Sequence, residues 1–389
     1  MDSIFDIYAQ LVCTGQLRLR VSDVLSINSE ESTYDFALLL ARKACNMTKL
    51  TVNIVVTKNG KVIEEVPMEP EIIDIYKPHP GTPVMCRILD LDEYKYYNND
   101  DISKVSNNLI EINKFGNLSD PLVLNRRISV PWTTVIMPSF SFAQALLEEA
   151  EEGDQHRLLE VLYRLDQEDP EVYWHNQSTL ISFRKNLLNS LGDGIIKLEN
   201  GSSNFMAKIL NKSNWAGGIT KLRDNREFYH KLPSQNLHTT LDNKSGVGII
   251  SASRNFHLFG KIVKNASFTI DNGRVTDFSA SEGYDALNVF FESDINANIV
   301  SGIALSDEDS IESQYLSINT HPFFAMENCT SIIFGGINID TLDALFYNSD
   351  LEDLNVEESL IQLVVPIGNK ETIISINGQI IIEEGNFIN

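Results

Sequence analysis

The segment YDFALLLARKACNMTKLTVNIVVT, residues 34–57, decides the fold class of the first part of this chain. Tyr34 to Asn46 places apolar residues at the spacing of one helix face. Leu50 to Thr57 is rich in β-branched residues and is followed by Asn59-Gly60, a turn signal. A helix that leads into a strand, with more apolar segments behind it, predicts a sheet covered by helices.

The segments that follow predict a connection, a strand and a capped helix. Residues 92–119 are polar and rich in Asn and Asp, so we predict a long surface connection there. Residues 129–137, SVPWTTVIM, predict another strand. Asp169 and Pro170 suit the N-cap and first turn of a helix that continues as far as Gly192.

The part beyond Gly192 is predicted to be rich in short strands. Residues 267–270 and 274–278 flank Asp271-Asn272-Gly273, in which Asn or Gly can adopt the positive φ of a hairpin turn. One helix is expected from Tyr284 to Ser293. Because 389 residues are too many for one ordinary core, we predict two domains.

The composition is that of a soluble globular protein, with 43% hydrophobic and 22% charged residues. The formal net charge of -23 repels phosphate backbones, so we expect no nucleic-acid partner. No run of apolar residues is long enough for a membrane span. The amino terminus has no positively charged segment before an apolar run, so we expect no secretory signal. The cysteines form no CxxC pair and are expected to be buried, reduced thiols of a cytoplasmic protein: Cys13, Cys45, Cys86 and Cys329.

Short motifs do not identify a reaction. The chain has no GxSxG or GxGxxG, and its seven histidines form no HxxxH or HExxH pair. The turn Trp215-Ala216-Gly217-Gly218 is expected to pack on the core. The alternative is that it forms part of the wall of a ligand-binding site. The carboxylates from Asp307 to Glu312 cluster as they do in a solvated loop.

Several longer segments, taken in order, resemble one enzyme family. WTTVIMPSFSFAQALL (132–147), LDQEDPEVYWHNQSTLISFRKNLL (165–188) and NWAGG (214–218) precede KLPSQNLHTT (231–240). SGIALSDEDS, MENCTSIIFGG, LIQLVVPIG and INGQIIIEEGNFI then follow. Together they resemble the aminopeptidase T and aminopeptidase S family of two-domain metallo-aminopeptidases over nearly the whole chain.

The resemblance implies a fold of class α/β plus α+β. We expect an amino-terminal α/β sandwich with a helical connection over residues 1–190 and a carboxy-terminal β-rich domain with helices over residues 191–389. A large internal cavity and a homodimer are also implied. In the family, two metal ions activate a water that attacks the first peptide bond of the substrate.

The positions that hold metal ligands in the family carry other residues here. Asn236, in the frame LPSQNLHT, stands at a glutamate position, and Gly302, in SGIAL, stands at another. Ser331, in TSIIFG, stands at a histidine position, and Asn338 aligns with a tyrosine that follows it. These replacements supply neither a carboxylate nor an imidazole.

The last family signature, a histidine and an aspartate before Ile-Gly, has also changed. Counting back from Ile367-Gly368 gives Gln362 and Val364 at these positions. We therefore predict no catalytic residue, no metal site and no other cofactor. The predicted peptide-binding residues are those at the former ligand positions, Asn236, Gly302, Ser331, Gln362 and Val364, with His238, His321 and Trp215 as further cavity residues.

The leading hypothesis is a catalytically inactive aminopeptidase homologue that binds a peptide in the former active-site cavity. Its ligand would be a precursor peptide of a modified-peptide natural product, and its partners would include peptide-modifying enzymes. The alternative is a working metallo-aminopeptidase with displaced ligands, for which His238, His321 and Glu327 are the candidates. A metal-independent enzyme that acts on a bound peptide is a third possibility.

Overall fold

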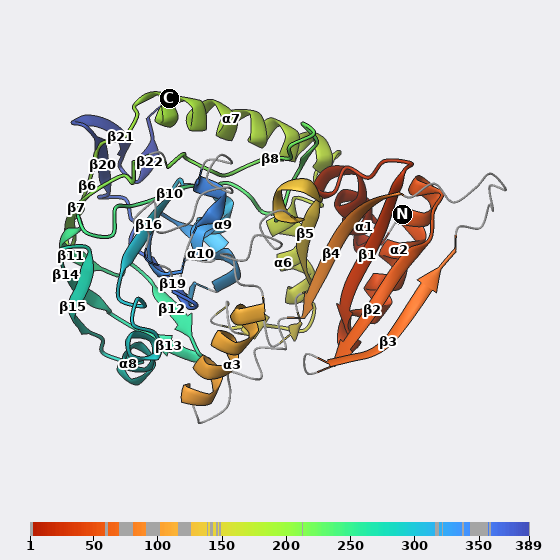
Figure 1. Cartoon of the computed structure of the whole chain (residues 1–389), viewed down its shortest axis with the longest axis horizontal. Coiled ribbons are helices and arrows are strands. Elements are labelled where there is room, and N and C mark those ends of the chain that lie inside the picture. The colour runs from red at the N-terminus through yellow and green to blue at the C-terminus, as the bar shows by residue number, and fades with distance from the viewer. Residues whose placement is uncertain are drawn as a thin grey trace.

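The computed structural model contains two halves side by side, an α/β half and a β-rich half (Figure 1). It describes residues 3–58, 61–69, 81–90, 102–115, 126–137, 139–140, 143–144, 147, 149–211, 213–315, 319–320, 322–336, 338–342, 357 and 359–388. Within these residues, no helix is both long and apolar enough to cross a membrane.

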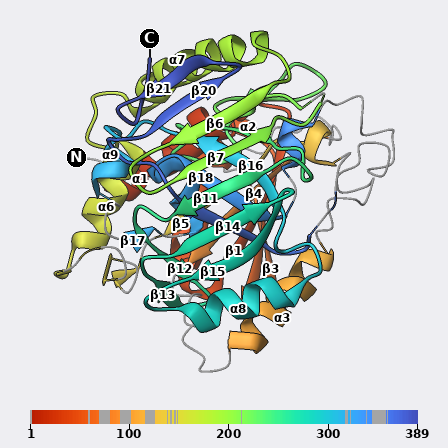
Figure 2. The same ribbon diagram turned by 90° about the vertical axis from the view of Figure 1, so that its left-hand side faces the viewer.

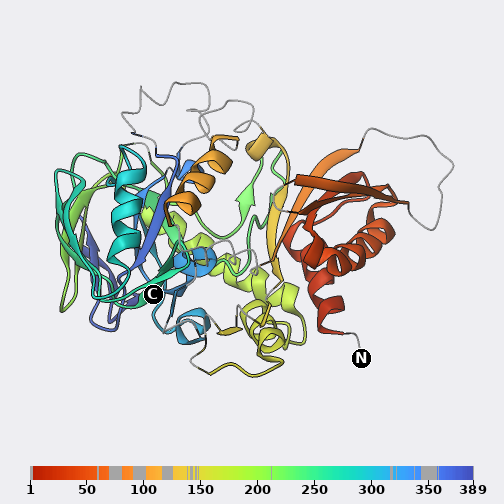
Figure 3. The ribbon, with the colours of Figure 1, turned by 90° about the horizontal axis from the view of Figure 1, so that it is seen from below.

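The first half is a five-stranded sheet in the order β3-β2-β1-β4-β5, parallel except for β3. Helix α2 packs on the sheet through Leu40 and Ala41, which share a buried core with Leu25 and Ile54. Figure 3 shows the helices of this half against one face of the sheet. The predicted helix and strand of residues 34–57 are therefore confirmed. The elements are α1 (Ile4–Gln10), η1 (Leu11–Gln16), β1 (Asp23–Glu30), η2 (Glu31–Thr33), α2 (Tyr34–Thr48), β2 (Val52–Lys58), β3 (Lys61–Met68), β4 (Thr82–Asp90) and β5 (Trp132–Met137).

Two helices, α6 (Asp154–Tyr163) and α7 (Pro170–Ser190), follow this sheet, and α7 connects the two halves. Asp169 caps α7 as predicted, because its side chain accepts hydrogen bonds from the backbone N–H groups of Glu171 and Val172 at 3.0 and 3.1 Å. Trp174 near the start of α7 belongs to the first core, whereas Ile181 and Leu188 belong to the second. One helix thus joins both cores.

The predicted surface connection over residues 92–119 is wrong for residues 102–115, and the rest of it lies outside the described residues. Residues Ile102–Phe115 form helix α3, which lies beside α8 (Figure 3). Ile102 and Val105 are buried in the second core. Their helical spacing is a weak signal among so many Asn and Asp residues. The helix is stabilised mainly by packing against the β-rich half, which lies far along the chain.

The second half packs a four-stranded sheet, β10-β16-β18-β19, against an eight-stranded one, β15-β14-β11-β7-β6-β20-β21-β22, with α8 at one end (Figure 2). Apolar residues of both sheets form the second core between them. The predicted hairpin is confirmed, with Asn272 and Gly273 at φ 49° and 75°, as is the helix at Tyr284–Ser293.

The elements of this half are β6 (Ile195–Glu199), β7 (Asn204–Lys208), β8 (Thr220–Lys221), β9 (Glu227–Phe228), β10 (Leu237–Thr240), β11 (Val247–Ser251), β12 (Asn255–Leu258), β13 (Lys261–Val263), β14 (Ser267–Asp271), β15 (Arg274–Ser279), α8 (Tyr284–Ser293), β16 (Val300–Leu305), α9 (Ile311–Tyr315), β17 (Asn319–Thr320), η4 (Pro322–Phe324), α10 (Ala325–Asn328), β18 (Ser331–Gly335), η5 (Ile339–Thr341), β19 (Gln362–Pro366), β20 (Ile373–Ile376), β21 (Gln379–Glu383) and β22 (Asn386–Phe387).

A buried ion pair anchors the segment around β9 to the first half. Arg226 donates from both terminal nitrogens to the carboxylate of Asp23, at 2.8 and 2.6 Å, and both side chains are almost fully buried. Its Nη2 also donates to the carbonyl oxygens of Leu17 and Arg18. The pair is bidentate, so it fixes the orientation of Arg226 as well as its distance from Asp23. The domain boundary at residue 190 and the large internal cavity stay predictions.

Candidate functional site

The residues predicted from the family frames share one face of the four-stranded sheet. The register pairs His238 with Ala304, Ala304 with Ser331, and Gly302 with Ile333. It also pairs Ile333 with Val364 and Gly335 with Gln362. Directly opposite residues, and alternate residues of one strand, point to the same side. We call this the site face; it carries Asn236, His238, Gly302, Ser331, Val364 and Gln362.

The opposite face of the same sheet is apolar. Leu237, Ile303 and Ile332 are fully buried there in the second core. Trp215 belongs to that core as well and is only 3% exposed. The prediction that the turn packs on the core is therefore confirmed, and the Trp215 side chain contributes to the core and not to the site face.

Asn236 is held in place by Glu327 of α10, which is 1% exposed. The Glu327 carboxylate accepts hydrogen bonds from the backbone N–H groups of Gln235 and Asn236 at 2.7 and 3.0 Å, and a short one from the Asn236 side-chain Nδ2. Lys231 adds an ammonium group 3.5 Å from the same carboxylate. Both oxygens of Glu327 are thus engaged by groups of the protein itself.

The orientation of the Asn236 amide determines how His238 bonds. Since Nδ2 of Asn236 donates to Glu327, its Oδ1 faces Nδ1 of His238 at 2.9 Å. An amide oxygen only accepts, so Nδ1 of His238 carries the proton and Nε2 keeps its lone pair. Burial lowers the pKa of His238 to about 4, opposed by the charges of Asp340 and Glu327, so the ring is neutral at pH 7.

Gly302 and Gln362 of the site face form a second cluster with Asn338, which lies against this face just before η5. A Cβ on Gly302 would lie 2.6 Å from Nδ2 of Asn338 and 2.8 Å from the carbonyl oxygen of Thr239. Nε2 of Gln362 donates to Oδ1 of Asn338 at 3.3 Å. Nδ2 of Asn338 is buried without a hydrogen-bond partner. The Asn338 amide therefore fills the space that a side chain at position 302 would need.

The remaining predicted residues differ in their surroundings. Ser331 is fully buried, and its hydroxyl lies 3.0 Å from the carbonyl oxygens of Ala325 and Cys329. Val364 is half-buried on the site face. His321 lies outside the described residues. The peptide-binding role assigned to these positions stays a prediction.

The residues present do not fit the pair of metal ions that the resemblance implies. Such ions need several carboxylate oxygens and imidazole nitrogens that converge on one point. Asn236 is already bonded to Glu327 and His238, and the space at Gly302 is filled by an amide. Within the described ranges, no three His, Cys, Asp or Glu side chains are grouped so that they could hold a metal ion.

The acidic segment Asp307 to Glu312 is not a solvated loop, so that prediction is wrong. Arg184 pairs with Asp307 at 2.6 Å, and Arg254 pairs with Glu308 at 2.5 Å. Glu312 is fully buried and pairs with Arg164 at 2.8 Å. Burial raises the pKa of Glu312 to about 7 although the guanidinium of Arg164 opposes the shift. The three arginines come from distant parts of the chain, which is why local sequence did not reveal them.

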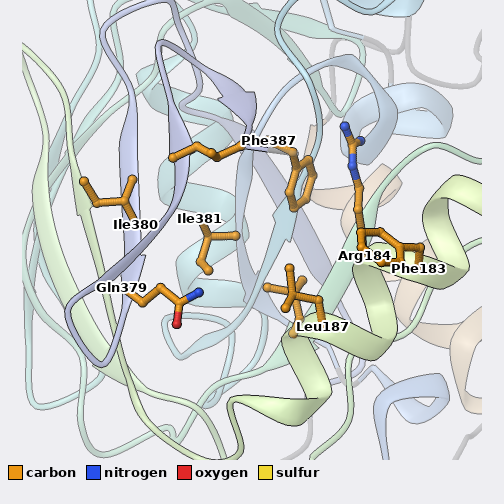
Figure 4. Close-up of a pocket in the computed structure, with 9 residues that line it drawn as sticks. Phe183, Arg184, Leu187, Gln379, Ile380, Ile381 and Phe387 are labelled. Carbon is orange, nitrogen blue, oxygen red and sulfur yellow. The ribbon is translucent and has the colours of Figure 1, made fainter.

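A separate apolar groove lies between α7 and the strands β21 and β22, with a volume of about 250 Å³ (Figure 4). Phe183 and Leu187 of α7 form one wall, and Ile380 and Phe387 belong to the other. The guanidinium of Arg184 lies 4.3 Å from the centre of the Phe387 ring. None of the predicted site residues lines this groove.

Comparisons with known proteins agree on one family. Residues 95–387 match the model of the thermophilic metalloprotease (M29) family. The chain is 27% identical to aminopeptidase AmpS of Bacillus subtilis (strain 168) over 190 residues, which cover 48% of this chain and 46% of that protein. It is 22% identical to aminopeptidase 2 of Geobacillus stearothermophilus over 247 residues, 62% of this chain and 60% of that protein. The matches thus span about half to three fifths of these two curated relatives.

The fold is shared with a solved structure over almost its whole length. Wild-type AmpT from Thermus thermophilus superposes with a TM-score of 0.77 and covers 99% of both chains. The sequence identity in this superposition is 16%. The predicted mixed α/β fold is therefore confirmed.

Proposed function

The chain belongs to the thermophilic metalloprotease family, and on that premise we propose that it is a catalytically inactive member that binds a peptide on the site face without cleaving it. The expected ligand class is a precursor peptide that other enzymes modify. The relatives' names describe aminopeptidases, so the shared scaffold is one associated with peptide substrates. What differs is the set of side chains at the former ligand positions.

The observation that carries the proposal is the filled space at Gly302. A glutamate at this position would place its Cβ 2.6 Å from Nδ2 of Asn338 and 2.8 Å from the backbone oxygen of Thr239. Contacts that short force atoms to move. The glycine at position 302 and the position of the Asn338 side chain are therefore consistent with each other. Together they favour a site in which side-chain amides replace the carboxylate.

The surroundings of Asn236 support the same proposal. Its side chain takes part in a buried network with Glu327 and His238 that needs no metal ion to satisfy its hydrogen bonds. Glu327, a candidate ligand under the alternative hypothesis, already accepts three hydrogen bonds and pairs with the ammonium of Lys231. Recruiting Glu327 to a metal would remove the partners of these buried groups, which is costly.

Metal content, hydrolysis and peptide binding, measured together, test the proposal. The purified protein is dialysed against Zn²⁺ or Co²⁺, its metal content is measured by mass spectrometry, and release from an aminoacyl reporter is followed. Equilibrium dialysis then measures the retention of a tripeptide library with free amino ends. We expect peptide retention without metal-dependent release. Two bound ions per chain that are lost together with hydrolysis would falsify the proposal, and so would absence of peptide retention.

A matched pair of variants tests whether the peptide binds at the site face. Asn236→Ala removes the hydrogen bond to His238 and is expected to weaken peptide retention. Asn176→Ala changes an exposed asparagine on α7 and is expected to leave retention unchanged. Equal retention by both variants, with the fold intact, would place the peptide elsewhere.

A further inference from the structure

Asn338 carries a buried hydrogen-bond donor that the protein itself leaves unused. Its side chain is 8% exposed, and Nδ2 has no hydrogen-bond partner. A buried polar group without a partner is costly, so each such group in a native structure calls for an explanation. The donor lies on the site face, against Gly302, which has no side chain that could accept from it.

The other half of the Asn338 amide is only weakly engaged. Gln362 donates to Oδ1 of Asn338 at 3.3 Å, which is long for an N–H···O hydrogen bond. Gln362 is itself exposed, and its side chain lies against Gly336, at 2.7 Å from the position of a Cβ there. An exposed side chain that makes one long hydrogen bond can rotate into water at little cost.

We propose that Asn338 is the contact residue for the peptide backbone. The Gln362 side chain occupies the position of the peptide until a peptide displaces it. After displacement, Nδ2 of Asn338 donates to a peptide carbonyl oxygen, and Oδ1 accepts from a peptide N–H. A side-chain amide and a peptide group have matching donors and acceptors, so the two can pair through both bonds. This inference rests on the proposed peptide-binding function and identifies the atoms that perform it.

The arrangement separates contact residues from positioning residues. Asn236 and Glu327 are bonded to each other, and Ser331 is buried against backbone carbonyl oxygens. These groups hold the site face in shape without offering a free donor to a ligand. Among the buried side-chain atoms of the site face that the structure describes, Nδ2 of Asn338 is the one without a hydrogen-bond partner.

Two variants with opposite expected signs test the inference, using the full-length protein and the tripeptide that the wild type retains best. Asn338→Leu keeps the branched shape of the side chain and removes both bonds to the peptide, so affinity by calorimetry should fall about 5- to 30-fold. Gln362→Ala removes the competitor, so affinity should rise about 2- to 5-fold.

The outcomes separate this inference from the proposed function. A wild type that retains no tripeptide overturns both. A wild type that binds, with Gln362→Ala binding equally or more weakly, overturns the displacement step. Unchanged affinity in Asn338→Leu overturns the contact role. The exposed control Asn176→Leu on α7 should match the wild type in affinity.

Discussion

Adding one methyl group at Gly302 should destabilise the protein through its contact with Asn338. The Cβ of Gly302→Ala would lie 2.6 Å from Nδ2 of Asn338, 2.8 Å from the carbonyl oxygen of Thr239 and 3.3 Å from the Ile333 side chain. The backbone of Gly302 does not adopt the left-handed conformation that favours glycine. The penalty therefore comes from packing and not from backbone strain.

Its magnitude follows from the cost of overpacking. Extra methyl groups in a filled interior reduce the free energy of unfolding by about 1–3 kcal/mol. Asn338→Ala in the same chain removes the closest contact and leaves the one with the Thr239 backbone. The double variant should therefore regain about 1 kcal/mol relative to the sum of the two single variants.

Urea unfolding followed by tryptophan fluorescence measures these differences, with Trp215 as a reporter buried in the same half. Gly201→Ala is the matched control, because the only close neighbour of its Cβ is the end of the flexible Glu371 side chain. It should change the free energy of unfolding by less than about 0.5 kcal/mol. A Gly302→Ala variant as stable as Gly201→Ala, or additivity with Asn338→Ala, would refute the packing argument.

Three further outcomes can be checked. Asn236→Asp places a second carboxylate against Glu327 and should reduce the free energy of unfolding by about 3–5 kcal/mol at pH 7. Part of this loss should be recovered at pH 5, and thermal unfolding midpoints at both pH values measure the difference. His238 has a pKa of about 4 in the folded protein and 6.5 in the unfolded chain. As the pH falls from 6.5 to about 4, His238 is protonated in the unfolded chain but not in the folded protein. This difference lowers the free energy of unfolding by about 3 kcal/mol. His238→Gln should flatten that fall relative to the wild type, and an unchanged slope would contradict the assigned burial. A thiol reagent should react only after unfolding, because all four cysteines are buried: Cys13, Cys45, Cys86 and Cys329.

The parts of the fold that local sequence predicted are those with local causes. The cap at Asp169 and the turn at Asn272-Gly273 act within a few residues, and both appear in the structure as predicted. Helix α3 was missed because its burial depends on α8, far along the chain. The buried carboxylate of Glu312 was missed for the same reason, since its partner Arg164 is 148 residues away.

The site shows a similar limit. The family frames located Asn236, Gly302 and Gln362, and the strand register brings them to one face. The sequence did not indicate that Glu327 would hold the Asn236 amide from 91 residues away. Lys231 was missed as well, although its place at the start of the KLPSQNLHTT segment was a signal that could have singled it out.

The two clusters on the site face support the proposal that this face binds a ligand. Around Asn236, each side-chain polar atom has a partner in Glu327 or His238. Around Gly302, space is filled closely, yet the Nδ2 group of Asn338 has no acceptor. Because an unsatisfied buried donor costs about 1–3 kcal/mol, and an apolar residue of the same size would avoid the cost, its presence is explained if a ligand supplies the acceptor. The unsatisfied donor of Asn338 therefore supports the proposal that a bound peptide supplies the missing acceptor on the site face.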